Sequence, residues 1–92
     1  MIEEKLSDLP NIGKELEKRL LDAGIHNPDE LRKTGSQQAF LRLNLADPGA
    51  CFNMLCALEG AIQNIRWHHL DKATKDELKD FLNILRLKGS KI

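Results

Sequence analysis

Residues 9–13, Leu-Pro-Asn-Ile-Gly, form a tight turn that leads directly into a helical pattern. The apolar positions of that pattern recur at spacings of four, four and three and so share one face of a helix: Ile12, Leu16, Leu20 and Ala23. Gly24 follows where a glycine would end the helix. We therefore predict a helix-hairpin-helix-like element at the N-terminus, with Leu9 and Ile12 packed into the domain.

The next segments carry clear signals for helix starts and ends. Asn27, Pro28 and Glu30 form a start signal, with Asn27 as the N-cap, Pro28 at the first helical position and Glu30 completing an arrangement like a capping box. Gly35 ends that short helix, and Ser36 is expected to cap another that runs to about residue 45. Two short helices therefore follow the N-terminal element.

The segment at residues 47–49, Asp-Pro-Gly, repeats the start signal and opens the longest apolar-periodic stretch. Its apolar stripe comprises Cys51, Leu55, Leu58, Ile62 and Ile65, broadened by Met54, Ala57 and Ala61. A helix this apolar is typical of the buried centre of a bundle. A last helix is predicted from about Asp71, with its inward positions at Thr74, Leu78, Phe81, Leu82 and Leu85.

No segment alternates convincingly with a period of two, so the predicted fold is all-α: a compact bundle of about five helices. A chain of 92 residues fits one domain, with a core at about residues 6–87 and a flexible tail at 88–92. Trp67 is interpreted as an anchor that closes the core, and His68 as a residue that orders the same corner. The residues expected to be structural are Leu9, Pro10, Ile12, Gly24, Gly60, Trp67 and His68.

Composition limits the classes of partner. The 14 Lys and Arg residues balance the 14 Asp and Glu residues, so the formal net charge is zero and a strongly basic total does not support nucleic-acid binding, although a local patch stays open. No apolar run reaches the ~18 residues of a membrane span, and the acidic first residues are unlike a signal peptide. We expect a cytoplasmic protein without membrane contact, in which Cys51 and Cys56 are buried and unbridged.

The sequence offers little for catalysis. It has no Gly-rich phosphate loop, no nucleophile beside a base in a recognisable motif, and no pair of acids outside solvated helix faces. His68 and His69 are adjacent and diverge on most backbones, while His26 and the cysteines complete no zinc spacing. We predict a protein that is not an enzyme, with no cofactor, no metal and no small-molecule substrate.

The turn at residues 9–13 is the candidate binding element. Backbone N–H groups at the start of the following helix, together with the positive end of its dipole, can hold a phosphate without any base contact. Gly13 would let the ligand approach the backbone, and Lys14 and Lys18, four residues apart, would reach neighbouring phosphate oxygens, with Arg19 as a further candidate. Asn11, which stands where many DNA-binding hairpins have their first glycine, is a further candidate for nucleic-acid binding.

Two alternatives stay open for this element and for the whole chain. The turn also serves simply to reverse the chain, and Glu15 and Glu17 flank Lys14 and would weaken a positive patch. The chain would then be a protein-interaction module, a homodimer included, that uses an apolar surface patch and binds no nucleic acid.

The order of motifs along the chain resembles the C-terminal domain of the TfoX (Sxy) competence-regulator family. After residues 9–13, the likeness continues through residues 20–25 (Leu-Leu-Asp-Ala-Gly-Ile), 39–43 (Ala-Phe-Leu-Arg-Leu), 57–62 (Ala-Leu-Glu-Gly-Ala-Ile) and 66–68 (Arg-Trp-His). It covers about residues 6–82. The resemblance implies a compact all-helical domain of a bacterial regulatory protein, in a stand-alone form without the N-terminal TfoX domain. We therefore favour a regulatory binding module, with sequence-independent nucleic-acid binding ahead of protein interaction.

Overall fold

The computed structural model describes residues 5–46 and 51–89. Within these ranges the chain forms five α-helices and two 3₁₀-helices and no strand, so the predicted all-α fold is confirmed. In chain order the elements are η1 (Leu6–Asp8), α1 (Lys14–Asp22), α2 (Pro28–Thr34), α3 (Ser36–Ala46), α4 (Phe52–Gln63), η2 (Trp67–His69) and α5 (Lys72–Gly89).

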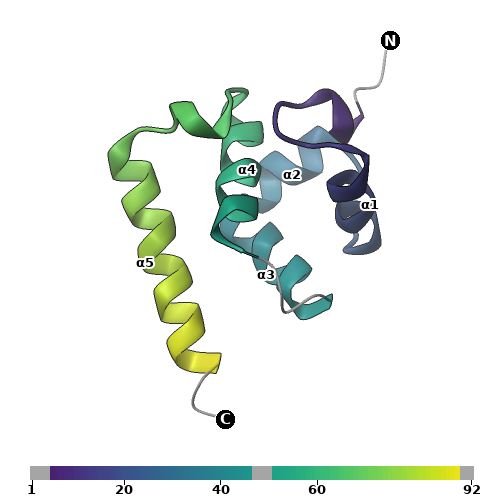
Figure 1. Cartoon of the computed structure of the whole chain (residues 1–92). Helices are drawn as coiled ribbons and strands as arrows, with labels where there is room; N and C mark the ends of the chain where they lie inside the picture. The colour runs from purple at the N-terminus through teal and green to yellow at the C-terminus, as the bar shows by residue number, and fades with distance from the viewer. Residues whose placement is uncertain (1–4, 47–50, 90–92) are drawn as a thin grey trace.

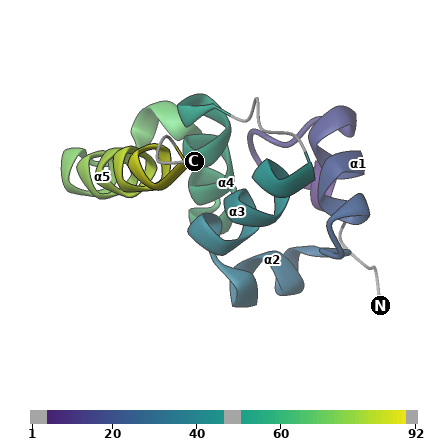
Figure 2. The same ribbon diagram turned by 90° about the horizontal axis from the view of Figure 1, so that it is seen from below.

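Helix α4 lies at the centre of the molecule. It contacts α2, α3, η2 and α5, and Figures 1 and 2 show α1 and α5 on opposite sides of it. The prediction of a buried central helix is confirmed, because five residues of α4 are buried: Leu55, Cys56, Leu58, Gly60 and Ala61. Its start signal at residues 47–49 lies outside the described residues, and Cys51 occupies the N-cap position without a side-chain cap.

Each of the five α-helices of the described chain contributes buried apolar residues to the core. Leu6, Leu20, Ile25, Leu31 and Phe40 are each at most 1% exposed, and they pack with the buried face of α4. The inner face of α5 adds Leu78 and Leu82. Removing these apolar side chains from water is the main term that stabilises such a small domain.

The predicted helix ends are confirmed where glycine was expected to end a helix. Gly24, with φ +87°, follows α1 in the left-handed region, and Ile25 N donates to Leu20 O at 2.9 Å across it. Gly35, with φ +83°, ends α2. Helix α4 ends the same way with Asn64 at φ 61°, so Ile65 lies beyond the helix and its N–H donates to Gly60 O.

Several sequence expectations were wrong in detail. Ser36 does not cap α3; it is the first residue of the helix, and its buried hydroxyl donates to Glu59 Oε1 at 2.6 Å. The reason is that Gly35 alone connects α2 to α3 and already accepts the first hydrogen bond of α3, from Ala39 N. Cys51 is exposed because it precedes α4, whereas Cys56 is buried as expected.

The turn at residues 9–13 lies between η1, three residues of 3₁₀-helix, and α1, nine residues of α-helix. At the C-terminal end, α5 continues through Gly89, two residues beyond the predicted boundary at residue 87. Residues 90–92 of the predicted tail lie outside the described residues.

Candidate functional site

The turn at residues 9–13 is built from buried apolar residues and one residue with positive φ. Leu9 is 4% and Ile12 5% exposed, and Ile12 N donates to Leu9 O at 3.4 Å. Asn11, between them, has φ 70°, a conformation that asparagine tolerates better than most residues. Pro10, half-buried, supplies the fixed φ that precedes it. The turn is therefore anchored in the core on both sides of Asn11.

The side chain of Asn11 fastens the turn to a distant part of the chain. Its Nδ2 donates to Ile65 O at 3.0 Å and, at 3.4 Å, to Ala57 O, and its Oδ1 accepts from Trp67 N at 3.1 Å. Both ends of the amide are thus occupied by backbone groups of α4, η2 and the segment that joins them. The sequence placed Asn11 among the phosphate-binding candidates, but its polar side-chain atoms are engaged inside the domain.

Gly60 provides the space for that contact. A Cβ atom added at Gly60 would lie 2.6 Å from Asn11 Nδ2 and 2.8 Å from Ile65 O, closer than real Cβ contacts allow. Gly60 is therefore the position where α4 lets the N-terminal turn approach, and a side chain there would push Asn11 away.

The start of α1, directly after the turn, has no side-chain cap. Gly13 is its N-cap, with an extended backbone (φ −88°, ψ −177°), and nothing lies within 4 Å of where its Cβ would be. The first hydrogen bond of the helix runs from Glu17 N to Gly13 O, so the N–H groups of Lys14, Glu15 and Leu16 precede it. We call these three N–H groups, with Gly13, the open start of α1.

Two lysines and two acids lie around the open start. Lys14 and Lys18 are exposed, and neither forms an ion pair among the described residues. Glu15 lies 3.2 Å from Arg19, at i,i+4, and Glu17 Oε2 accepts from Ser7 N at 3.1 Å. The two acids expected to weaken the lysines thus contact other groups, and Arg19, which pairs with Glu15, drops out of the candidate set.

A surface hollow adjoins the turn. It is lined on one side by residues 8–11 and on the other by Asn64, Ile65, Arg66 and His69. Sequence reasoning missed Arg66 and His69 as site candidates, because only the contact of Asn11 with the segment after α4 brings them beside the turn. No spacing in the sequence signals this.

Trp67 and His68 form the corner next to that hollow. The indole of Trp67 is half-buried against the core and stacks on the imidazole of His68, with ring centroids 4.3 Å apart and planes 24° apart. The His68 carbonyl accepts from Lys75 Nζ at 3.3 Å, which ties η2 to α5. His68 orders this corner through stacking and its backbone, and not through a ring hydrogen bond among the described contacts.

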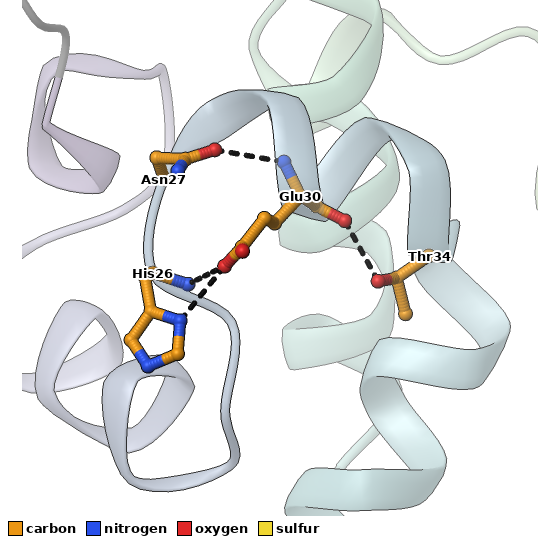
Figure 3. Close-up of polar contacts among 4 residues, drawn as sticks. All are labelled: His26, Asn27, Glu30 and Thr34. Atoms are coloured by element: carbon orange, nitrogen blue, oxygen red, sulfur yellow. Dashed lines mark hydrogen bonds and ion pairs between the residues drawn. The ribbon is translucent and has the colours of Figure 1, made fainter.

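The start of α2, drawn in Figure 3, contrasts with that of α1. Asn27 Oδ1 accepts from Glu30 N at 2.9 Å, and Glu30 Oε1 accepts from His26 N at 2.7 Å and lies 2.9 Å from His26 Nδ1. Pro28 has no N–H to satisfy. The N-cap prediction is confirmed, but the carboxylate of Glu30 reaches His26 and not Asn27. These contacts, the backbone hydrogen bond from His26 above all, hold the pKa of Glu30 below its usual value.

No group of three His, Cys, Asp or Glu side chains within residues 5–46 and 51–89 is placed to hold a metal ion. None of the helices in the same ranges is both long and apolar enough to cross a membrane.

Comparisons with known proteins identify the relatives of this chain. The model of the TfoX C-terminal domain matches residues 2–82. The DNA transformation protein TfoX of Haemophilus influenzae is 34% identical over 79 residues, which are 86% of this chain and 36% of that protein. Protein Sxy of Escherichia coli is 35% identical over 82 residues, which are 89% of this chain and 39% of that protein. The chain therefore spans well under half the length of these relatives.

Two solved structures from Listeria monocytogenes have the same fold. The triclinic crystal form of an uncharacterized protein superposes with a TM-score of 0.89 at 54% identity, covering 90% of this chain and 94% of that one. The tetragonal form of a protein of unknown function gives a TM-score of 0.84 at 56% identity, covering 86% and 98%. With the family match over nearly its whole length, the chain belongs to the TfoX C-terminal domain family.

Proposed function

We propose that this domain is a non-catalytic regulatory module that binds nucleic-acid phosphates at the open start of α1, with Lys14 and Lys18 beside it. The observation that carries the proposal is an uncapped helix start held in a fixed position. The turn before it is fastened by Asn11, while no side chain caps the N–H groups that follow Gly13.

The chemistry suits the backbone of a nucleic acid and not its bases. Unpaired N–H donors and the positive end of a helix dipole favour a phosphate, and two exposed ammonium groups add charge without reading sequence. The neutral total charge means that binding depends on this local arrangement. We expect modest, salt-sensitive and sequence-independent affinity.

The relatives support a regulatory setting for this activity. One is named a DNA transformation protein, and we propose that the present chain contributes nucleic-acid contact to a process of that kind, competence regulation, inside the cell. Since the match covers 36% and 39% of the two relatives, the domain would supply one function of such a protein and not the whole of it.

A second candidate function rests on exposed apolar side chains. Leu45 is 87%, Leu87 65% and Ile84 55% exposed, at the end of α3 and on the outer side of α5. Exposed apolar groups of this size favour a protein-interaction module, self-association included. Light scattering over a concentration series tests this: a mass that rises with concentration favours the second function.

The proposed function is tested by fluorescence anisotropy with labelled duplex and single-stranded DNA at low and at physiological salt. The wild type should bind at low salt and weaken as salt rises. Lys14→Glu/Lys18→Glu should lower the affinity roughly tenfold or more, because two cationic contacts become repulsive. The control is Lys72→Glu/Lys79→Glu, which makes the same charge change on exposed positions of α5, across the molecule from α1.

The outcomes separate the two functions. Binding that is absent at low salt, or that both double variants weaken equally, contradicts the proposal. Charges more than about 8 Å from a phosphate are largely screened at physiological salt. Equal weakening by both double variants at that salt would therefore mean that binding depends on net charge and not on a local contact at α1.

A further inference from the structure

The hollow beside the turn is the strongest feature that the proposed function leaves unused. It brings Arg66 and His69 next to residues 8–11, although more than fifty residues separate the two segments in the chain. We propose that Arg66, assisted by His69, is a second phosphate contact for the same nucleic acid, so that a strand crosses the hollow from the open start of α1. This inference rests on the proposed function and extends its site.

The position of Arg66 relative to the turn is fixed by the contacts of Asn11. The two residues that flank Arg66 are both bonded to the Asn11 amide: Ile65 through its carbonyl at 3.0 Å and Trp67 through its N–H at 3.1 Å. Arg66 therefore lies between two hydrogen bonds that join it to the turn. A cation held in this way loses little backbone entropy on binding a ligand.

The turn joins the two contacts. Lys14 is three residues after Asn11, so their Cα atoms are at most about 10 Å apart, and Asn11 is bonded to both residues that flank Arg66. A nucleic acid carries one phosphate per about 3.4 Å of helix axis along each strand, so its backbone offers successive phosphates to groups held in this way.

The hollow is lined by one arginine, one histidine and one acid. Arg66 and His69 are exposed; the Arg66 carbonyl accepts from His69 N at 2.9 Å, whereas the Arg66 guanidinium forms no hydrogen bond or ion pair among the described contacts. One acid, Asp8, also lines the hollow and opposes an anion, but its Oδ2 accepts from Lys5 N at 2.9 Å. The guanidinium group is the side chain whose planar donors best match a phosphate.

The test measures duplex DNA binding against salt for the wild type, Arg66→Ala, Arg66→Lys, His69→Ala and Arg42→Ala. Arg42 is an exposed arginine of α3 outside the hollow and serves as the matched control. Arg66→Ala should weaken binding severalfold and lower the slope of log affinity against log salt by about 0.9, the value for one lost phosphate contact. Arg66→Lys should restore most of the slope, His69→Ala should weaken binding less, and Arg42→Ala should change neither quantity. Thermal unfolding checks that each variant is folded.

The outcomes distinguish this inference from the proposed function. If Arg66→Ala binds like the wild type while Lys14→Glu/Lys18→Glu is weakened, the second contact is overturned and the proposed function stands. If only Arg66→Ala is weakened, the hollow is the site and the open start of α1 is not. A wild type that does not bind at low salt overturns both.

Discussion

The starts of α1 and α2 lie in the same half of the molecule, and their backbone donors are treated in opposite ways. At α2 the Asn27 side chain accepts from Glu30 N, the Glu30 side chain accepts from His26 N just before the helix, and Pro28 has no N–H. At α1 the N-cap is Gly13, and no side chain caps the helix. We call the start of α2 closed, because side chains of the chain itself bond its backbone N–H groups, and this start stabilises the fold. The open start of α1 is held rigidly and leaves its N–H groups available to a ligand.

What holds the open start in place is the contact between Asn11 and the region around Gly60. At α2 the helix start is held by local hydrogen bonds, each of which spans three or four residues. At α1 the organising bonds span up to 56 residues and leave the helix start untouched.

The largest effect is expected from Gly60→Ala, which removes the support of the open start. The added Cβ would press against Asn11 Nδ2 and Ile65 O, so we expect a loss of about 2 kcal/mol of stability and a Tm lower by roughly 10 °C. DNA binding should weaken as well, because the turn moves. Thermal unfolding followed by circular dichroism checks the first point, and anisotropy the second. An unchanged Tm would show that the turn is not held by this approach.

Asn27→Ala should have a smaller effect and only on stability. The loss of the cap on Glu30 N should cost about 1 kcal/mol, or roughly 5 °C in Tm. DNA affinity, measured where the variant is fully folded, should equal that of the wild type because α2 is not part of the proposed site. Weaker binding by this folded variant would remove the distinction between the two starts.

A still smaller effect is expected in the pH dependence of the stability that Glu30 contributes at the start of α2. Because the pKa of Glu30 is lowered in the folded chain, its contribution is present above the ordinary carboxyl pKa and is lost as pH falls through the lowered value. The Tm difference between the wild type and Glu30→Gln should therefore shrink between about pH 6 and about pH 3. Glu77→Gln on exposed α5 is the control. A difference that stays constant with pH would contradict this role of Glu30.

The sequence was a good guide wherever the interaction is local. The cap at Asn27, the stops at Gly24 and Gly35 and the apolar stripe of α4 all depend on neighbours within a turn or two, and all were predicted. Ser36 was misassigned because its partner, Glu59, is 23 residues away.

The candidate site could be predicted only in part for the same physical reason. Gly13, Lys14 and Lys18 follow from the turn and the helix period, but Arg66 and His69 reach the site through tertiary contacts of Asn11 that no local pattern encodes. Those contacts also turned Asn11 from a predicted ligand contact into the residue that positions the site.

Stability and DNA affinity measured together for Gly13→Ser show whether the uncapped start of α1 is the binding site. Serine is neutral, its Cβ would meet nothing within 4 Å, and the extended backbone of Gly13 suits an N-cap. The hydroxyl should close the start of α1 as Asn27 closes that of α2. The account predicts a Tm equal to or about 1–2 °C above that of the wild type, with affinity at least about threefold lower, because the donors are no longer free for phosphate. An equally stable variant that binds DNA as tightly as the wild type would contradict it.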